Sequence, residues 1–107
     1  MDQAIFVYMT AGSADEARRI ARALVEERLA ACVNLIDGMG SVYRWEGRVE
    51  EGTETVMIAK TQASRFESLR ARVRELHSYE TPCIVTLPLG KGDAPYLDWI
   101  ATESSAH

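Results

Sequence analysis

Apolar residues along this chain fall into continuous runs and into helical spacing, and the two patterns alternate. Ala4–Met9 is an unbroken run of apolar and β-favouring residues, which is typical of a central strand covered on both faces. Thr55–Ala59 has the same character and is expected to lie beside that strand in the centre of a sheet. Between them, Ala14–Arg28 places apolar residues every three or four positions and predicts an amphipathic helix. The apolar face of this helix is expected to comprise Ala17, Ile20, Ala21, Leu24 and Val25.

The stretch from Ala30 to Thr61 predicts two unusually long strands folded back at Glu46-Gly47. Strands in globular proteins usually have about five or six residues, and the first arm here is about twice as long even if a kink over Asp37–Gly40 bends it. In the return arm, Glu50–Gly52 is expected to form a bulge or local irregularity. A chain of 107 residues cannot cover so long a hairpin alone, so its distal part is expected to contact another subunit.

The second half of the chain repeats the order of helix and strand. Ser64 and Glu67 have the capping-box spacing of a helix start, as Ser13 and Glu16 have before the first helix. The second helix is expected to end near His77. Its buried stripe is expected to consist of Phe66, Leu69, Val73 and Leu76.

Two shorter elements are predicted towards the C-terminus. Cys83–Leu87 reads as a fourth strand, which Pro88 stops or confines to a sheet edge. Asp93 is placed to cap a short helix with Pro95 in its first turn. The last residues, from Thr102 to His107, are expected to be frayed. The apolar residues of this helix are Tyr96, Leu97, Trp99 and Ile100.

The order of elements predicts an α+β fold. Shifting the chain against itself lays Ser13 on Ser64 and Cys32 on Cys83, which indicates two βαβ halves. The order β-α-β-β-α-β is that of a ferredoxin-like sandwich, here a single domain over residues 1–107 with a long central hairpin and a C-terminal helix. Both main helices then cover one face of a four-stranded antiparallel sheet. The open face needs a cover, so we expect a homo-oligomer in which each hairpin packs against the next protomer.

Composition and charge narrow the function. The net charge of −4 and the scattered Lys and Arg residues argue against a nucleic-acid-binding surface, which needs a dense basic patch. The N-terminus has no basic leader, and the run Ile5–Met9 is too short for a signal-peptide core or a membrane span. We therefore expect a cytoplasmic protein without a membrane partner. Cys32 and Cys83 are expected to stay free thiols.

The donors that could hold a metal are Cys32, His77, Glu80 and Cys83, with the thioether of Met9 as a soft addition. No paired C-x₂-C or H-x₃-H cluster occurs, so a four-ligand zinc site within one chain is not predicted. A Cu(I) site assembled between subunits stays open, because thiolate, thioether and imidazole suit that ion. The structural alternative is that both cysteines fill inward strand positions and that His77 satisfies the last carbonyls of its helix.

Three further residues have both structural and functional interpretations. Lys60 ends an apolar strand, where an unpaired charge is costly, so Glu54, Glu80 or an anion is expected near it. Trp45 and Trp99 are more often core or interface residues than platforms for a ligand.

The sequence does not predict an enzyme. A hydrolase built on Cys32, His77 and Glu80 would need a nucleophile elbow or a glycine-rich oxyanion loop, and neither accompanies these residues. Phosphate-loop and dinucleotide fingerprints are absent as well, since Gly38-Met39-Gly40 precedes a strand rather than a helix. We accordingly expect no organic cofactor.

Five blocks of residues, in order, resemble those of a known family. They are ERLAACVN at 27–34, SVYRWEG at 41–47, KT at 60–61, HSYETP at 77–82 and YLDW at 96–99. Together they resemble the CutA divalent-cation tolerance proteins, and the resemblance runs from the first strand to the last helix. It implies a compact cytoplasmic homotrimer of ferredoxin-like subunits, locked by long hairpins and associated with tolerance to copper and other divalent cations.

The resemblance also assigns site residues by position. Cys32 lies in the cysteine block of the family and His77 matches its histidine. Some bacterial members have a cysteine at Met9 and a second histidine at Leu76, and Ser78 replaces the usual proline. The residues matching those that line the cleft between subunits are Tyr43, Trp45, Lys60, Tyr79 and Glu80.

Three functions remain open at this point. The leading hypothesis is a homotrimer that responds to metal ions and binds copper or another divalent cation weakly through His77, with Met9 or Cys32. The second is a small-ligand sensor, similar to the PII signalling trimers, whose intersubunit cleft binds an anionic metabolite. The third is a structural trimeric scaffold.

Overall fold

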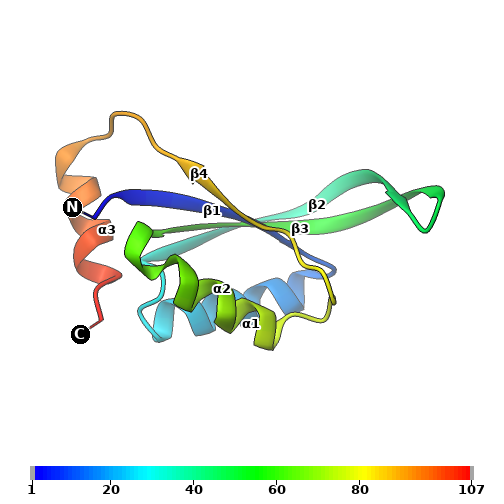
Figure 1. Cartoon of the computed structure of the whole chain (residues 1–107), viewed down its shortest axis with the longest axis horizontal. Helices are drawn as coiled ribbons and strands as arrows, with labels where there is room; N and C mark the ends of the chain where they lie inside the picture. Colours follow the sequence, from blue (N-terminus) through cyan, green and yellow to red (C-terminus); the bar gives the residue numbers. More distant parts are fainter. Residues whose placement is uncertain (1, 107) are drawn as a thin grey trace.

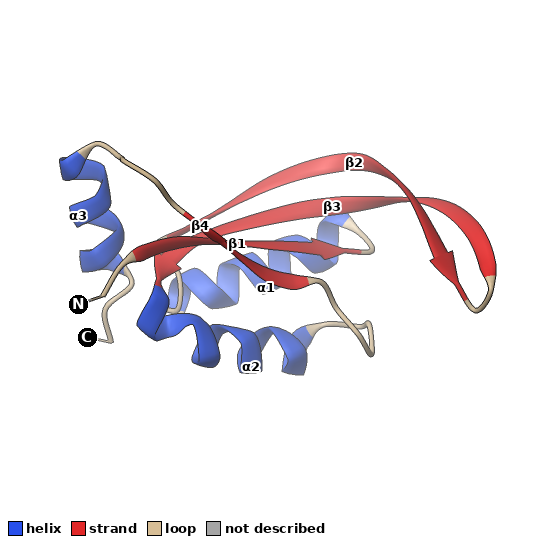
Figure 2. Ribbon diagram, turned by 45° about the horizontal axis from the view of Figure 1, so that its top comes forward, coloured by secondary structure: helices blue, strands red, loops and turns tan. Residues whose placement is uncertain are grey.

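The computed structural model describes residues 2–106 and has the predicted order of elements. The strands form one antiparallel sheet in the order β2-β3-β1-β4, and α1 and α2 cover one of its faces (Figure 1, Figure 2). The predicted ferredoxin-like fold and the central pair of strands are thereby confirmed. The elements are β1 (Ala4–Ala11), α1 (Ala14–Glu26), β2 (Cys32–Trp45), β3 (Arg48–Gln62), a 3-10 turn (Ala63–Arg65), α2 (Phe66–Leu76), β4 (Ile84–Pro88) and α3 (Ala94–Glu103).

The core lies between the sheet and the pair of helices. Opposed residues of antiparallel strands point to the same face, and the pairs Val7–Ala59 and Met9–Met57 are fully buried beneath α1 and α2. Because the rows of β1 and β3 alternate, Phe6, Tyr8 and Thr10 point to the other face. We call this other face the open face. The helices add Ile20, Leu24, Leu69 and Val73 to the core.

A bulge halfway along β2 changes which of its residues point to the open face. Pairing between β2 and β3 is continuous except between Ile36 and Met39, where β2 contains an extra residue and Gly38 takes a positive φ of 72°. Since side chains alternate along a strand, the extra residue reverses which positions face which side. Tyr43 and Trp45 therefore lie on the open face, and the hairpin tip projects beyond the helices (Figure 1).

The first helix ends two residues before its predicted end. Arg28 adopts a left-handed φ of 59°, and its N–H bonds to the carbonyl of Val25 at 3.1 Å. The N–H of Leu29 bonds to the carbonyl of Leu24 at 2.9 Å, which completes a Schellman motif. A non-glycine residue pays about 1–2 kcal/mol for this conformation, so its side chain is expected to contribute compensating contacts.

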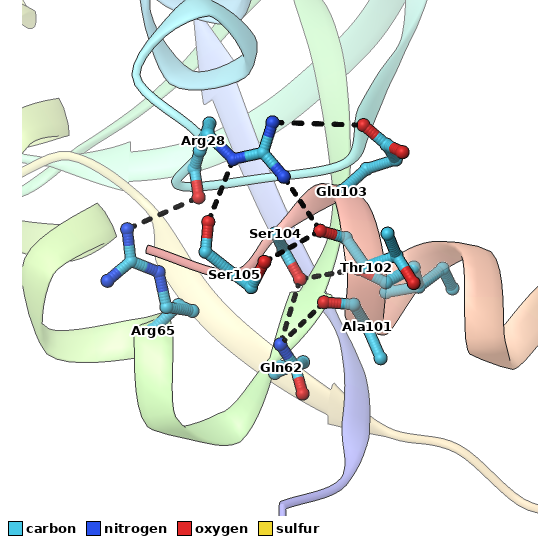
Figure 3. Close-up of polar contacts among 9 residues, drawn as sticks. Arg28, Gln62, Arg65, Ala101, Thr102, Glu103, Ser104 and Ser105 are labelled. Carbon is cyan, nitrogen blue, oxygen red and sulfur yellow. Dashed lines mark hydrogen bonds and ion pairs between the residues drawn. The ribbon is translucent and has the colours of Figure 1, made fainter. Parts of the chain in front are cut away.

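Those contacts hold the end of α3 (Figure 3). The guanidinium of Arg28 donates to the carbonyls of Thr102 and Ser105 at 2.8 and 2.9 Å, and the amide of Gln62 donates to the carbonyl of Ala101 at 3.1 Å. Such groups satisfy the orphan carbonyls of a helix end. The predicted fraying is therefore wrong from Thr102 to Ser105, while His107 lies outside the described residues.

The second capping box is also wrong. Ser13 caps α1 as predicted, accepting from the N–H of Glu16 at 3.2 Å. Ser64, by contrast, donates its hydroxyl to Asp2, and α2 begins at Phe66 after a 3-10 turn without a side-chain cap. The carboxylate of Asp2 therefore binds the serine hydroxyl that would otherwise cap the helix.

Three smaller predictions need correction. Glu50–Gly52 pairs regularly with β2, so the bulge lies in the outgoing arm rather than the return arm. Asp93 caps α3 only through its backbone carbonyl, which accepts from Tyr96 and Leu97. Val25 is exposed, because it lies at the edge of the apolar face of α1. None of the helices in residues 2–106 is long and apolar enough to cross a membrane.

Candidate functional site

The open face has a concave site at its hairpin end, which we call the hairpin pocket. Its volume is about 480 Å³. Tyr43 and Trp45 come from β2, Glu54 from β3, and Tyr79 from the loop between α2 and β4. The complete lining is Thr10, Tyr43, Trp45, Gly52, Thr53, Glu54, Tyr79, Glu80, Thr81 and Cys83.

Glu54 links three of the four segments that line the pocket, which are β1, β2, β3 and the loop. One oxygen of its carboxylate accepts from the hydroxyl of Ser41 at 2.9 Å, and the other accepts from the hydroxyl of Tyr79 at 3.3 Å. Ser41 stands on the hairpin and Tyr79 on the loop, so a single side chain ties both to β3. The aromatic rings are thereby arranged around a carboxylate.

The charge in the hairpin pocket is negative. Burial raises the pKa of Tyr79, and the neighbouring Glu54 carboxylate raises it further. Burial raises the pKa of the Cys83 thiol too, with a smaller contribution from Glu54. Both groups are therefore neutral at physiological pH, and no Lys, Arg or His of the described residues lines the pocket. Glu54 and Glu80 supply its charge.

His77 lies beneath the pocket and not in it. Its ring is fully buried, with Nε2 2.7 Å from the carbonyl oxygen of Thr10 and Nδ1 3.0 Å from the backbone nitrogen of Tyr79. A carbonyl only accepts and an N–H only donates, so the ring donates through Nε2 and accepts through Nδ1. The ring of His77 thus fixes the loop that presents Tyr79, while its backbone N–H donates to the carbonyl of Val73 in the last turn of α2.

Glu16 supports the same loop from the start of α1. Its carboxylate accepts from the N–H of Ser78 at 2.7 Å and lies 3.8 Å from Nδ1 of His77. Burial alone would raise the pKa of Glu16, but the hydrogen bonds from Ser78 together with His77 lower it from its usual 4.5. The sequence had marked Glu16 only as half of a capping box, and nothing in its spacing pointed to the loop.

The predicted copper ligands do not form a site within one chain. Both ring nitrogens of His77 are occupied, and Met9 is fully buried in the core. Cys32 pairs with Lys60, while Met9 pairs with Met57, so the two sulfur residues are three rungs, about 10 Å, apart along the sheet. Within residues 2–106, no three His, Cys, Asp or Glu side chains are grouped to hold a metal ion. Cys32 and Cys83 are both free thiols, as predicted.

Lys60 lies at the opposite end of the open face, beside α3. Its ammonium donates to the hydroxyl of Tyr96 at 2.9 Å and stands 5.4 and 5.3 Å from the ring centres of Phe6 and Tyr96. The carboxylate partner expected for it is not found among residues 2–106, because two aromatic rings hold the charge instead. Trp99 stacks on Tyr96 with ring centres 5.6 Å apart. We call Phe6, Lys60, Tyr96 and Trp99 the α3-end cluster.

The structure therefore brings together four of the five predicted cleft residues. Tyr43, Trp45, Tyr79 and Glu80 line one pocket, and Lys60 lies elsewhere in the same chain. The sequence predicts Glu54 only as a partner of Lys60, and it carries no signal that places Thr10 in the pocket. Glu54 has no motif of its own, and its place follows from the register between β2 and β3.

Residues 5–103 match the CutA1 divalent ion tolerance protein family. The divalent-cation tolerance protein CutA of Thermus thermophilus is 50% identical over 94 residues, which are 88% of this chain and 91% of that protein. The corresponding protein of Archaeoglobus fulgidus is 47% identical over 95 residues, 89% of this chain and 92% of its own. Protein CutA of Mus musculus is 46% identical over 99 residues, 91% of this chain and 56% of that protein.

The fold agrees with the sequence comparison. The solved structure of the divalent cation tolerance protein from Thermus thermophilus has a TM-score of 0.93 at 46% identity and covers 95% of this chain and 99% of its own. That of CutA1 from Oryza sativa has a TM-score of 0.94 at 35% identity and covers 98% of this chain and 96% of its own. Sequence and fold agree over nearly the whole length, and this chain belongs to the CutA1 divalent ion tolerance protein family.

Proposed function

We propose that this chain acts in tolerance to divalent cations as a homotrimer assembled through its open face and its hairpin. The observation that supports the assembly is the exposure of large apolar side chains that the chain cannot cover itself. Val42, Trp45 and Val49 of the hairpin tip are 69%, 59% and 64% exposed. On the open face, Val85 and Leu87 of β4 are exposed as well. Val85 and Leu87 are neighbours on the face of the sheet that α1 and α2 leave uncovered, and an exposed apolar surface of this kind marks an interaction site.

We propose in addition that copper or another divalent cation binds only to the assembled trimer. The His77, Cys32 and Met9 set does not meet within one chain, so a site needs donors from more than one subunit. Glu80 is exposed and Glu54 is partly exposed, and the Cys32 thiol is partly exposed as well. These groups supply a negative field that attracts cations, as the net charge of −4 does for the whole chain.

The assembly is tested by two matched substitutions. Leu87 on the open face and Val25 on α1 are both 42% exposed. Leu87→Arg is expected to dissociate the trimer, and Val25→Arg is expected to leave it intact, as measured by sedimentation velocity. A Leu87→Arg protein that sediments like the Val25→Arg protein would refute assembly through the open face.

Copper binding is tested with the same pair of proteins. Equilibrium dialysis against Cu²⁺ is expected to show binding to wild type and to Val25→Arg, and loss of binding in Leu87→Arg. Equal binding by all three proteins would mean that a single chain holds the metal, contrary to the proposal.

A second candidate function is a small-ligand sensor. It is favoured by the hairpin pocket, whose volume of about 480 Å³ lies in the range of metabolite sites. A structural scaffold without a ligand, the third candidate, predicts instead that substitutions in the pocket change neither binding nor the response of cells to metal. A panel of metabolites, read by the melting temperature of the protein, separates the two.

We also propose that the protein acts in the cytoplasm, a compartment in which its two free thiols would stay reduced. Relatives differ in this respect, since the Arabidopsis thaliana protein is named as chloroplastic. Cell fractionation with an antibody against the full chain checks the location.

A further inference from the structure

We propose that the hairpin pocket binds an organic cation, an ammonium or guanidinium group on a short aliphatic stem. The inference deepens the small-ligand candidate and rests on it. It also reverses the sequence-based expectation of an anionic metabolite.

The walls of the pocket have the composition that favours a cation. Tyr43, Trp45 and Tyr79 bring three aromatic rings to one cavity, and their faces carry the negative end of a quadrupole. The Glu54 carboxylate joins β3 to the loop beside these rings, and Glu80 stands at the rim. A cation between aromatic faces and a carboxylate is attracted by both.

The charge of the pocket is not neutralised by the chain. Within residues 2–106, neither Glu54 nor Glu80 forms an ion pair, and no basic residue lines the cavity. The two hydroxyls that Glu54 accepts from leave its negative charge in place. An anion would enter a negative field in which this subunit offers no basic group to receive it, whereas a cation would supply the counter-charge that this subunit lacks.

The α3-end cluster shows what aromatic residues on this face of the sheet do. There the ammonium of Lys60 lies over the rings of Phe6 and Tyr96 and donates to a tyrosine hydroxyl. The hairpin pocket has aromatic rings and tyrosine hydroxyls too, and a carboxylate in addition, but the described part of the chain brings no cation to it. The chain thus fills one aromatic site with its own ammonium and leaves the other to a ligand.

The test uses n-butylguanidinium as the probe and a tryptophan as the reporter. The chain has two tryptophans, so Trp99→Phe leaves Trp45 of the pocket as the reporter. Adding n-butylguanidinium to this assembled protein is expected to change the Trp45 emission saturably. The neutral isostere n-butylurea is expected to bind at least about tenfold more weakly, and the anion butyrate is expected to cause no change.

A pair of substitutions on one strand tests the role of the carboxylate. Glu54→Gln removes the charge and keeps one oxygen to accept from one of the two hydroxyls, while its amide NH2 can donate to the oxygen of the other. It is expected to weaken n-butylguanidinium binding about tenfold while leaving n-butylurea unchanged. Glu51→Gln, on the opposite face of β3, is expected to change neither. Circular dichroism and the melting temperature confirm that both variants remain folded.

Three results would overturn the inference, and they are distinguishable. Tighter binding of butyrate or of a nucleotide would reject the cation and leave the small-ligand sensor standing. Silence of Trp45 with every probe would reject the sensor as well. Binding of n-butylguanidinium only to the dissociated Leu87→Arg chain would show that another subunit fills the pocket in the trimer.

Discussion

The two ends of the open face both carry aromatic side chains, but these surround a lysine at one end and a glutamate at the other. At the α3 end, Lys60 lies between Phe6 and Tyr96, and Tyr96 belongs to a helix whose last turn Arg28 holds (Figure 3). At the hairpin end, aromatic rings surround Glu54 in a cavity that none of the described basic residues lines. The chain supplies the cation at the α3 end, whereas the described residues supply none at the hairpin end.

The difference follows from which segment closes each end. α3 contacts β3 through Tyr96 and Ala101, so the α3-end cluster contains its own cation. Figure 2 shows α3 at the end of the sheet away from the hairpin tip. At the hairpin end, no helix within residues 2–106 contributes to the lining, and the fourth wall is a loop. That loop keeps its shape because His77 and Glu16 bond to its backbone from below. A rigid but uncovered cavity is what a binding site requires.

The largest effect is expected from removing the support of the loop. His77→Ala leaves the buried carbonyl of Thr10 and the part-buried N–H of Tyr79 without their partner, and is expected to cost about 3 kcal/mol of unfolding free energy. Urea unfolding at matched protein concentration measures it, since the stability of an oligomer depends on concentration.

The control for this change lies in the same loop. Glu80→Ala removes an exposed side chain without a hydrogen-bond partner in the described part of the chain, and is expected to change stability by less than about 0.5 kcal/mol. If His77→Ala abolished copper binding and left stability unchanged, His77 would be a ligand and not a support.

The case of His77 also shows what the sequence could and could not predict. The order of strands and helices could be predicted from the spacing of apolar residues. Burial in a strand or a helix selects apolar residues at regular short intervals, and this pattern is visible within each segment. Whether an imidazole nitrogen is free depends on Thr10, 67 positions away, and no local pattern records such a contact. The family resemblance predicts His77 as a ligand from its position in the sequence, and that position does not record which contacts the ring makes.

A second large effect is expected at the opposite end. Arg28→Ala removes two hydrogen bonds, to the carbonyl of Thr102 in the last turn of α3 and to that of Ser105 just after it, and is expected to cost about 2 kcal/mol of unfolding free energy. Hydrogen exchange of the amides from 101 to 105 is expected to become faster, while that of the hairpin stays unchanged. Arg28→Lys keeps the charge but lacks the planar guanidinium, and its unfolding free energy is expected to lie between those of wild type and Arg28→Ala. Wild-type stability in Arg28→Lys would show that the charge alone is sufficient.

The sequence-based prediction for the end of α3 was wrong for a similar reason. Its short apolar pattern and polar tail predicted fraying from Thr102, yet Ser104 is fully buried. The cause is again distant, since Arg28 and Gln62 reach the helix end from other elements. The same holds for the bulge in β2, which a Gly-rich kink suggested but which only the pairing with β3 could locate.

A smaller effect is expected when the internal cation is removed. Lys60→Met keeps the length of the side chain and loses the charge between Phe6 and Tyr96, which is expected to cost about 1 kcal/mol. The emission of Trp99, stacked on Tyr96, is expected to shift, while that of Trp45 stays unchanged. A shift of both would mean that the two ends are coupled through the sheet and cannot be compared as separate sites.

The smallest effect is expected from acid, and it discriminates between the two ends. The pKa of Glu16 is lowered below 4.5 in the folded protein, so the carboxylate contributes stability that is fully present above pH 4.5 and is lost as the pH falls through the lowered value. The hairpin end is therefore expected to loosen first on acidification, and Trp45 emission should change before that of Trp99. Asp2 also has a pKa lowered by its hydrogen bonds with Ser64, but its side chain is exposed, so its protonation is expected to have the smaller effect on stability. Glu16→Gln is expected to reduce the fall in unfolding free energy between about pH 5 and pH 3, and an unchanged pH profile in that variant would assign the acid sensitivity to another carboxylate.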